Sequence, residues 1–241
     1  MRTLESTIDN LYNTFSKYTT EGMHHCNCGC IKEENLIKLH SKPLRQLEED
    51  DLISYHGSAL YTWGDVQHYK HYLPRICELV SKHEDFRFIG IDELHAKLDY
   101  AKWTEWPINE QRAIKDFVIE NWVDLINNNH PNIRDNQLAD YAKFFDIETL
   151  ISLWKVNSSN FALRNFVYFF YYHGTQILND GLKIENKVLG KEFIQFFESG
   201  DILKKLESNF FENEKADSEY ADKISIVLQM IEQEQKIKNS R

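Results

Sequence analysis

The stretch EQRAIKDFVIENWVDLIN, residues 110–127, decides the fold class. Its apolar residues recur at spacings of three and four, which places them on one face of a helix. They are Ile114, Phe117, Val118, Trp122, Leu125 and Ile126. Asn109 is a candidate N-cap, and the turn-forming segment NNNHPN ends the helix.

Similar periodicity occurs on both sides of this stretch. Helices are predicted before it at 4–18, 32–40, 48–62, 65–82 and 92–102, and after it at 135–145, 147–155, 160–173, 188–212 and 218–236. Gly200 is a candidate break in the region 188–212. The one strand candidate is a ribbon at 85–91, DFRFIGI. The sequence therefore predicts an all-α protein of about ten helices packed as antiparallel pairs. The pairs between 92 and 173 resemble a helical-repeat arrangement, although no fixed sequence period is present.

The length of 241 residues suits one large domain. We expect a single all-α domain over 1–241. Within it, residues 1–30 form an N-terminal helix plus a Cys/His loop, 31–130 a histidine-rich first lobe and 131–241 a helical second lobe. Glycine and proline are scarce, at nine and four residues, which favours helices joined by short polar loops.

The net charge of −10 argues against a sequence-independent nucleic-acid binder and against binding to an anionic membrane surface. The first residues lack the apolar core of a signal peptide. The most apolar run, FVYFFYY at 166–172, is far shorter than the roughly 20 residues that span a bilayer. The expected location is the cytoplasm, without nucleic-acid or membrane partners.

Motifs of several common enzymes are missing from the sequence. It contains no nucleophile elbow, no Walker loop, no dinucleotide fingerprint and no zincin motif. Carboxylates and histidines on helices could still form an active site, so enzymatic activity stays open, with the balance against it.

The segment MHHCNCGC, residues 23–30, is the strongest candidate metal site. It offers His24, His25, Cys26, Cys28 and Cys30 within one short loop, and three thiolates with one imidazole match a structural zinc site. The spacing is C-x-C-x-C rather than C-x-x-C, and closely spaced thiolates also suit Cu(I). The alternative is a thiol-rich loop that holds no metal. The fourth cysteine, Cys77, lies in a predicted helix and is expected in the core.

A second candidate is a binding groove along the predicted helix 65–82. His68, His71 and Arg75 lie along one side of it, and Trp63 precedes it. This stripe could bind an anionic group or complete a metal site. Alternatively, it forms a polar border whose side chains bond to nearby loop carbonyls and carboxylates.

Four segments, CNCGC, SKPLRQLEEDDLISY, LYTWGDVQHYKHYLPRICELV and LDYAKWTEWPINEQRAIKDF, resemble an uncharacterised bacterial family of all-helical proteins. The resemblance covers about residues 24–125. It is most specific around Trp63-Gly64-Asp65 and Tyr72-Leu73-Pro74-Arg75. It implies an all-helical fold with an N-terminal Cys-rich element and no known activity. Gly29 before Cys30 departs from the family's C-x-C-C element.

Three functional hypotheses follow. The leading one is a soluble helical protein-interaction module with an unknown protein partner and a small structural metal site, for which zinc is the candidate ion. The second is a metal-dependent enzyme whose site lies near the cysteine loop and the 65–82 helix. The third is an acidic inhibitor or immunity protein, which rests on the net charge alone.

Overall fold

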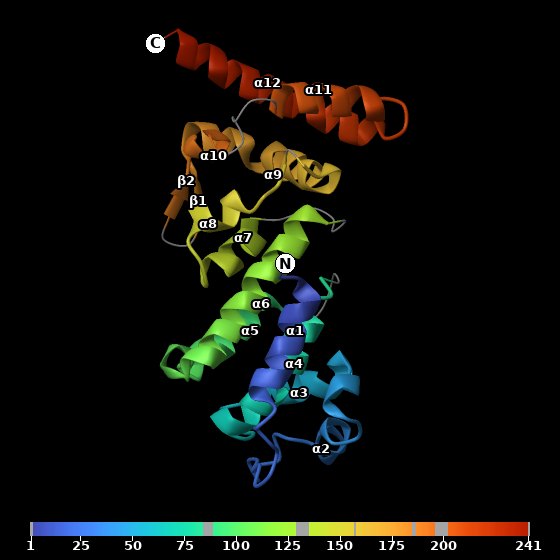
Figure 1. Cartoon of the computed structure of the whole chain (residues 1–241), viewed down its shortest axis with the longest axis vertical. Helices are drawn as coiled ribbons and strands as arrows, with labels where there is room; N and C mark the ends of the chain where they lie inside the picture. Colours follow the sequence, from blue (N-terminus) through green and yellow to red (C-terminus); the bar gives the residue numbers. More distant parts are fainter. Residues whose placement is uncertain are drawn as a thin grey trace. The chain divides into compact units, whose positions relative to one another are not determined.

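The computed structural model describes residues 2–83, 89–128, 135–156, 158–184, 187–195 and 202–240. These residues are mainly helical, with one two-stranded antiparallel sheet, and the all-α prediction is confirmed (Figure 1). The candidate helix break at Gly200 and residues 85–88 of the candidate ribbon lie outside the described residues. Ile89 and Gly90 lead directly into a helix.

The chain divides into two compact units, Met1–Asn121 and Trp122–Arg241. The predicted lobe boundary at 130 lies close to this division, and the single domain stays a prediction.

The first unit contains the helices that surround the cysteine loop. Its elements are α1 (Leu4–Phe15), α2 (Glu33–Leu39), the 3-10 helix η1 (Leu44–Gln46), α3 (Glu49–Ser58), α4 (Val66–Val80), α5 (Ile91–Tyr100), the 3-10 helix η2 (Trp103–Glu105) and the start of α6 (Ile108–Asn127). Helix α1 packs on α4, and α2 packs on α3.

Helix α4 is the most buried helix of this unit, because apolar residues and several polar ones face inward. Its N-terminus is fixed by Asp65, whose side chain accepts hydrogen bonds from the amides of Gln67 and His68. The helix continues through Pro74 and contains Cys77, which is fully buried as expected of a core residue.

The second unit contains the end of α6 and the remaining elements. These are α7 (Asp135–Ala142), α8 (Ile147–Ser152), α9 (Asn160–Asn179), β1 (Leu182–Ile184), β2 (Lys187–Leu189), α10 (Glu192–Gln195), α11 (Ile202–Asn213) and α12 (Ser218–Asn239). Helices α11 and α12 form an antiparallel pair, and α12 packs on α9 (Figure 1). Phe166, Phe169 and Phe170 of α9 are fully buried, as the apolar stretch predicts.

The hairpin of β1 and β2 corrects the prediction of a helix from residue 188. Val188 and Leu189 pair with Lys183 and Leu182, and the helix begins only at Glu192. Gly181 precedes the hairpin with φ of +77°, and a Cβ there would lie 2.2 Å from Cγ1 of Val188. Only glycine combines this backbone conformation with such a close approach.

Among the described residues, every helix is either too short or too polar to cross a bilayer.

Candidate metal centre and the polar side of helix α4

The cysteine loop is attached to the segment that leads into α4. The amide of Cys26 donates to the carbonyl of Thr62 at 2.8 Å, and the amide of Gly64 donates to the carbonyl of His24 at 2.8 Å. Between these two bonds, His25 and Trp63 form an antiparallel bridge. Trp63 is fully buried, so the start of the loop is held against the core of the first unit.

Three thiols converge in this loop. The sulfurs of Cys26, Cys28 and Cys30 all lie within 4.8 Å of one another, close enough to hold a metal ion. The Sγ atoms of Cys28 and Cys30 are 2.9 Å apart, and the amide of Cys28 donates to Sγ of Cys26 at 3.3 Å. Gly29 has φ of +83° and turns the chain between Cys28 and Cys30. Glycine adopts this left-handed conformation without a steric penalty.

The thiols differ in acidity because they hydrogen-bond to one another. Hydrogen bonds from Cys26 and then Cys30 to the Cys28 thiolate lower the pKa of Cys28 to about 7. The hydrogen bond to Cys28 raises the pKa of Cys30 to about 11. The Cys28 thiol is therefore about half ionised near neutral pH. Thiolates are the form that binds metals, so Cys28 is the readier ligand, whereas Cys30 would release a proton on binding.

Neither predicted histidine ligand belongs to this group. Within the described part of the chain, the cluster of close metal-binding side chains consists of the three thiols. The ring of His24, an exposed residue, packs edge-on at 6.4 Å from the ring of His68. His25 takes part in the bridge to Trp63. A histidine as fourth ligand stays a prediction.

His68 and His71, the two histidines predicted to line a groove along α4, contact the backbone of the loop that precedes the cysteines. His68 Nε2 lies 3.1 Å from the carbonyl of Glu21, and its Nδ1 accepts from the amide of Asp65 at 3.2 Å. His71 Nδ1 lies 2.8 Å from the carbonyl of Tyr18. These are the contacts that the polar-border alternative describes. They hold residues 18–21, just before the cysteine loop, onto α4.

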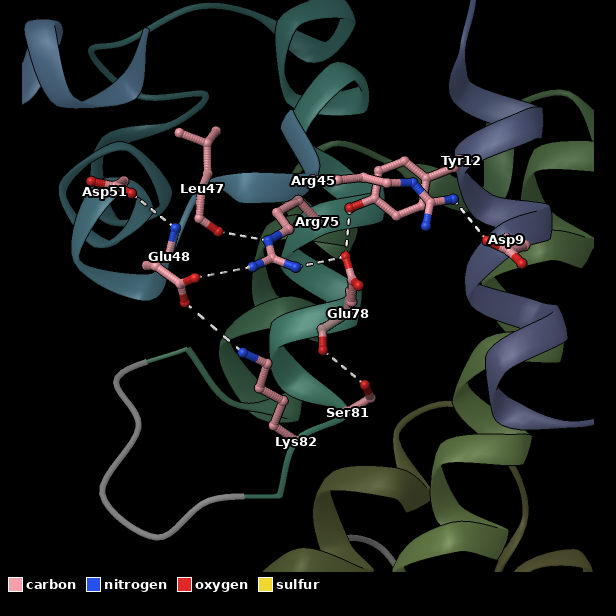
Figure 2. A network of polar contacts seen from close by, with 10 residues as sticks. All are labelled: Asp9, Tyr12, Arg45, Leu47, Glu48, Asp51, Arg75, Glu78, Ser81 and Lys82. Atoms are coloured by element: carbon pink, nitrogen blue, oxygen red, sulfur yellow. Dashed lines mark hydrogen bonds and ion pairs between the residues drawn. The ribbon is translucent and has the colours of Figure 1, made fainter. Parts of the chain in front are cut away.

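Arg75 is the centre of a polar network on the same helix (Figure 2). Its Nε donates to the carbonyl of Leu47 at 2.6 Å, and its guanidinium pairs with Glu78 at 2.7 Å. Glu78 also accepts from the hydroxyl of Tyr12 at 2.6 Å, which joins α1 to α4. Glu48 lies at 3.9 Å from the guanidinium. Arg75 is only 5% exposed, so its guanidinium interacts with these internal partners rather than with solvent.

The four residues of the predicted groove are thus mostly internal. Trp63 packs edge-on against Tyr55 with ring centroids 5.4 Å apart, and both residues are buried. His68 is 6% exposed. The stripe attaches loops to α4, and a ligand groove along it stays a prediction.

Thr62 and Gly64 also belong to this site, although their role in it could not be predicted from the sequence. They anchor the loop through backbone groups, which carry no residue-specific signal.

Comparison of the chain with protein-family models, with curated proteins and with solved structures finds no match.

Proposed function

We propose that this protein is a helical protein-interaction module whose loop 23–30 holds one structural Zn²⁺ ion through Cys26, Cys28 and Cys30. The observation that supports the proposal is the convergence of three sulfurs within 4.8 Å. Sulfurs at about 2.3 Å from a tetrahedral ion lie about 3.8 Å apart. The Cys28 and Cys30 sulfurs, now 2.9 Å apart, would move apart by about 1 Å on binding, a movement that fits an exposed loop containing a glycine.

The ion would have a structural effect because of where the loop is attached. The loop follows α1 and is bonded to residues 62–64, so the ion would stiffen the connection between α1 and the start of α4. Binding would also stabilise the fold, because the unfolded chain has no preformed site. His24 or His25 would complete a closed site.

An interaction role is supported by large apolar side chains on the surface of the first unit. Ile108 is 70% exposed and Ile37 is 63% exposed. A protein partner that docks on this unit would cover such side chains. The proposed partner is therefore a protein.

A metal-dependent enzyme is the second candidate, because the group of three thiols leaves a fourth coordination position free for water or substrate. The two candidates differ in the fourth ligand. In a closed structural site, replacing both His24 and His25 by alanine should weaken zinc binding strongly. In an open site, the same double variant should bind zinc as the wild type does.

Metal content tests the proposal directly. Reduced protein purified without a tag should contain about one equivalent of zinc per chain by elemental analysis. The variant Cys28→Ser should lose the metal, and residues 1–30 should then exchange their amide hydrogens faster while α6 stays protected. Asn27→Ala, an exposed change between two of the cysteines, is the matched control and should keep the zinc. Zinc and copper both far below one equivalent, with three freely titratable thiols in the loop, would refute the site.

A further inference from the structure

A second site lies away from the cysteine loop, in a pocket between α3 and α5. Its volume is about 390 Å³, within the range of small-molecule sites. Ile53, Ile89 and Ala96 contribute apolar surface, and His56, Glu93 and Lys97 contribute polar groups. A pocket of this size and lining suits a ligand with an apolar body and one polar end.

Lys97 places a cation in the wall of the pocket. The side chain is only 6% exposed, and its Nζ donates to the carbonyls of Gly57 and Ala59, each at 2.9 Å. It also lies 3.9 Å above the ring of Tyr61. None of these partners carries a formal charge, and among the described residues no carboxylate forms an ion pair with Lys97. Burial lowers the pKa of Lys97 to about 8, so most molecules carry the charge at neutral pH.

His56 lines the same pocket, and its two ring nitrogens are enclosed by protein atoms. It is 3% exposed, and in the described structure neither ring nitrogen has a hydrogen-bond partner. Burial, together with the charge of Lys97, lowers the pKa of His56 to about 4. The neutral imidazole has one N–H group to donate, and a buried donor without an acceptor is unfavourable.

The acidic groups near the pocket lie on α3 and α5. Glu93 accepts a hydrogen bond from the amide of Gly90 at 3.0 Å. Burial and then a hydrogen bond with Asp92 raise the pKa of Glu93 to about 7. Glu49 of α3 accepts from the amide of Ile89 at 3.0 Å. Below neutral pH the wall therefore carries the Lys97 charge while Glu93 is largely protonated.

We propose that the pocket between α3 and α5 binds a small monocarboxylate with an apolar body. The carboxylate supplies the counter-charge that Lys97 lacks, and the apolar body packs on Ile53, Ile89 and Ala96. A buried cation without a counter-charge is costly, and a bound carboxylate supplies that counter-charge. This site does not depend on the metal centre.

The test uses 2-naphthoate as ligand and 2-naphthamide as its uncharged analogue, with the full-length chain in solution. At about pH 6, titration with 2-naphthoate should shift the amide NMR signals of Gly57 and Ala96 saturably. It should bind about tenfold more tightly than 2-naphthamide, the ratio expected for one poorly hydrated ion pair. At about pH 8.5 the affinity for 2-naphthoate should fall about fivefold. Deprotonation of Lys97 removes the attracting charge, and deprotonation of Glu93 adds a repelling one.

Three variants assign the effect to this pocket. Lys97→Met should remove the preference for the carboxylate, and Lys97→Arg, which keeps the charge, should preserve it. Ala96→Trp should block both compounds by filling the pocket. Should Lys97→Met not fold, the pH comparison on the wild-type chain still decides. Equal affinity for the two compounds, or no saturable shift at Gly57 and Ala96 with millimolar 2-naphthoate, would overturn the proposal. Cys28→Ser should bind 2-naphthoate like the wild type, whether or not the cysteine loop binds zinc.

Discussion

At the scale of single residues, Gly29 and Gly57 show how backbone conformation alone sets the effect of a side chain. A Cβ added at either position meets no atom within 4 Å, so space does not distinguish them. Gly29 has φ of +83°, whereas Gly57 lies in helix α3. An L-residue is strained in the first conformation and favoured in the second.

The two alanine variants should therefore change stability in opposite directions. Gly29→Ala should lower the free energy of unfolding by about 1 kcal/mol, the cost of a left-handed L-residue. Gly57→Ala should raise it by about 0.5 kcal/mol, because the unfolded chain loses conformational freedom. Urea denaturation of the two variants side by side measures both. The same sign for both would show that conformation is not the deciding factor.

The cysteine cluster also belongs to this scale. Cys26, Cys28 and Cys30 follow one another so closely that their convergence could be predicted from the sequence. The position of the histidines could not. His24 faces His68 of α4 and His25 pairs with Trp63, and both contacts depend on how distant segments pack.

At the scale of elements, helices were predictable and the hairpin was not. Each long helix repeats its apolar spacing over several turns, and the observed α4 and α12 differ from the predicted ranges by at most three residues at an end. Each strand of the hairpin has only three residues, too few for an alternating pattern to stand out. The hairpin is defined by its pairing and by Gly181.

The start of α4 has a reciprocal cap that can be tested. The Asp65 side chain accepts from the amides of Gln67 and His68, and the ring of His68 accepts from the amide of Asp65. Asp65→Ala should lower the free energy of unfolding by about 1 kcal/mol, whereas Asp65→Ser should recover most of that loss. Thermal or urea unfolding checks this. A serine variant no better than alanine would show that the cap contributes little.

At the scale of the whole molecule, the sequence predicted the fold class but not the pocket between α3 and α5. His56 and Lys97 lie about forty residues apart in the chain, on helices that neither periodicity nor motif links. Their burial and the lack of a charged partner arise only when the helices pack.

The buried imidazole should make global stability depend on pH. The pKa of His56 falls from 6.5 to about 4 on folding, so between these values the unfolded chain binds the proton more readily. Stability should therefore decrease as the pH falls from 6.5 to 4, by about 3 kcal/mol from this group.

Urea unfolding at several pH values isolates this contribution. His56→Leu should flatten the acid side of the stability profile, whereas His40→Leu, at an exposed histidine, should keep the wild-type slope. An unchanged slope in His56→Leu would mean that other groups cause the acid sensitivity.

The bridge between His25 and Trp63 links the outside of the molecule to an indole in its interior. A rearrangement of the loop should therefore change the backbone position of Trp63, whose ring lies edge-on to Tyr55. Trp63 is thus a buried reporter residue for the state of the loop. With fluorotryptophan incorporated and the 19F NMR signal of residue 63 assigned, binding or release of a metal ion by the exposed loop should change the chemical shift of this buried residue.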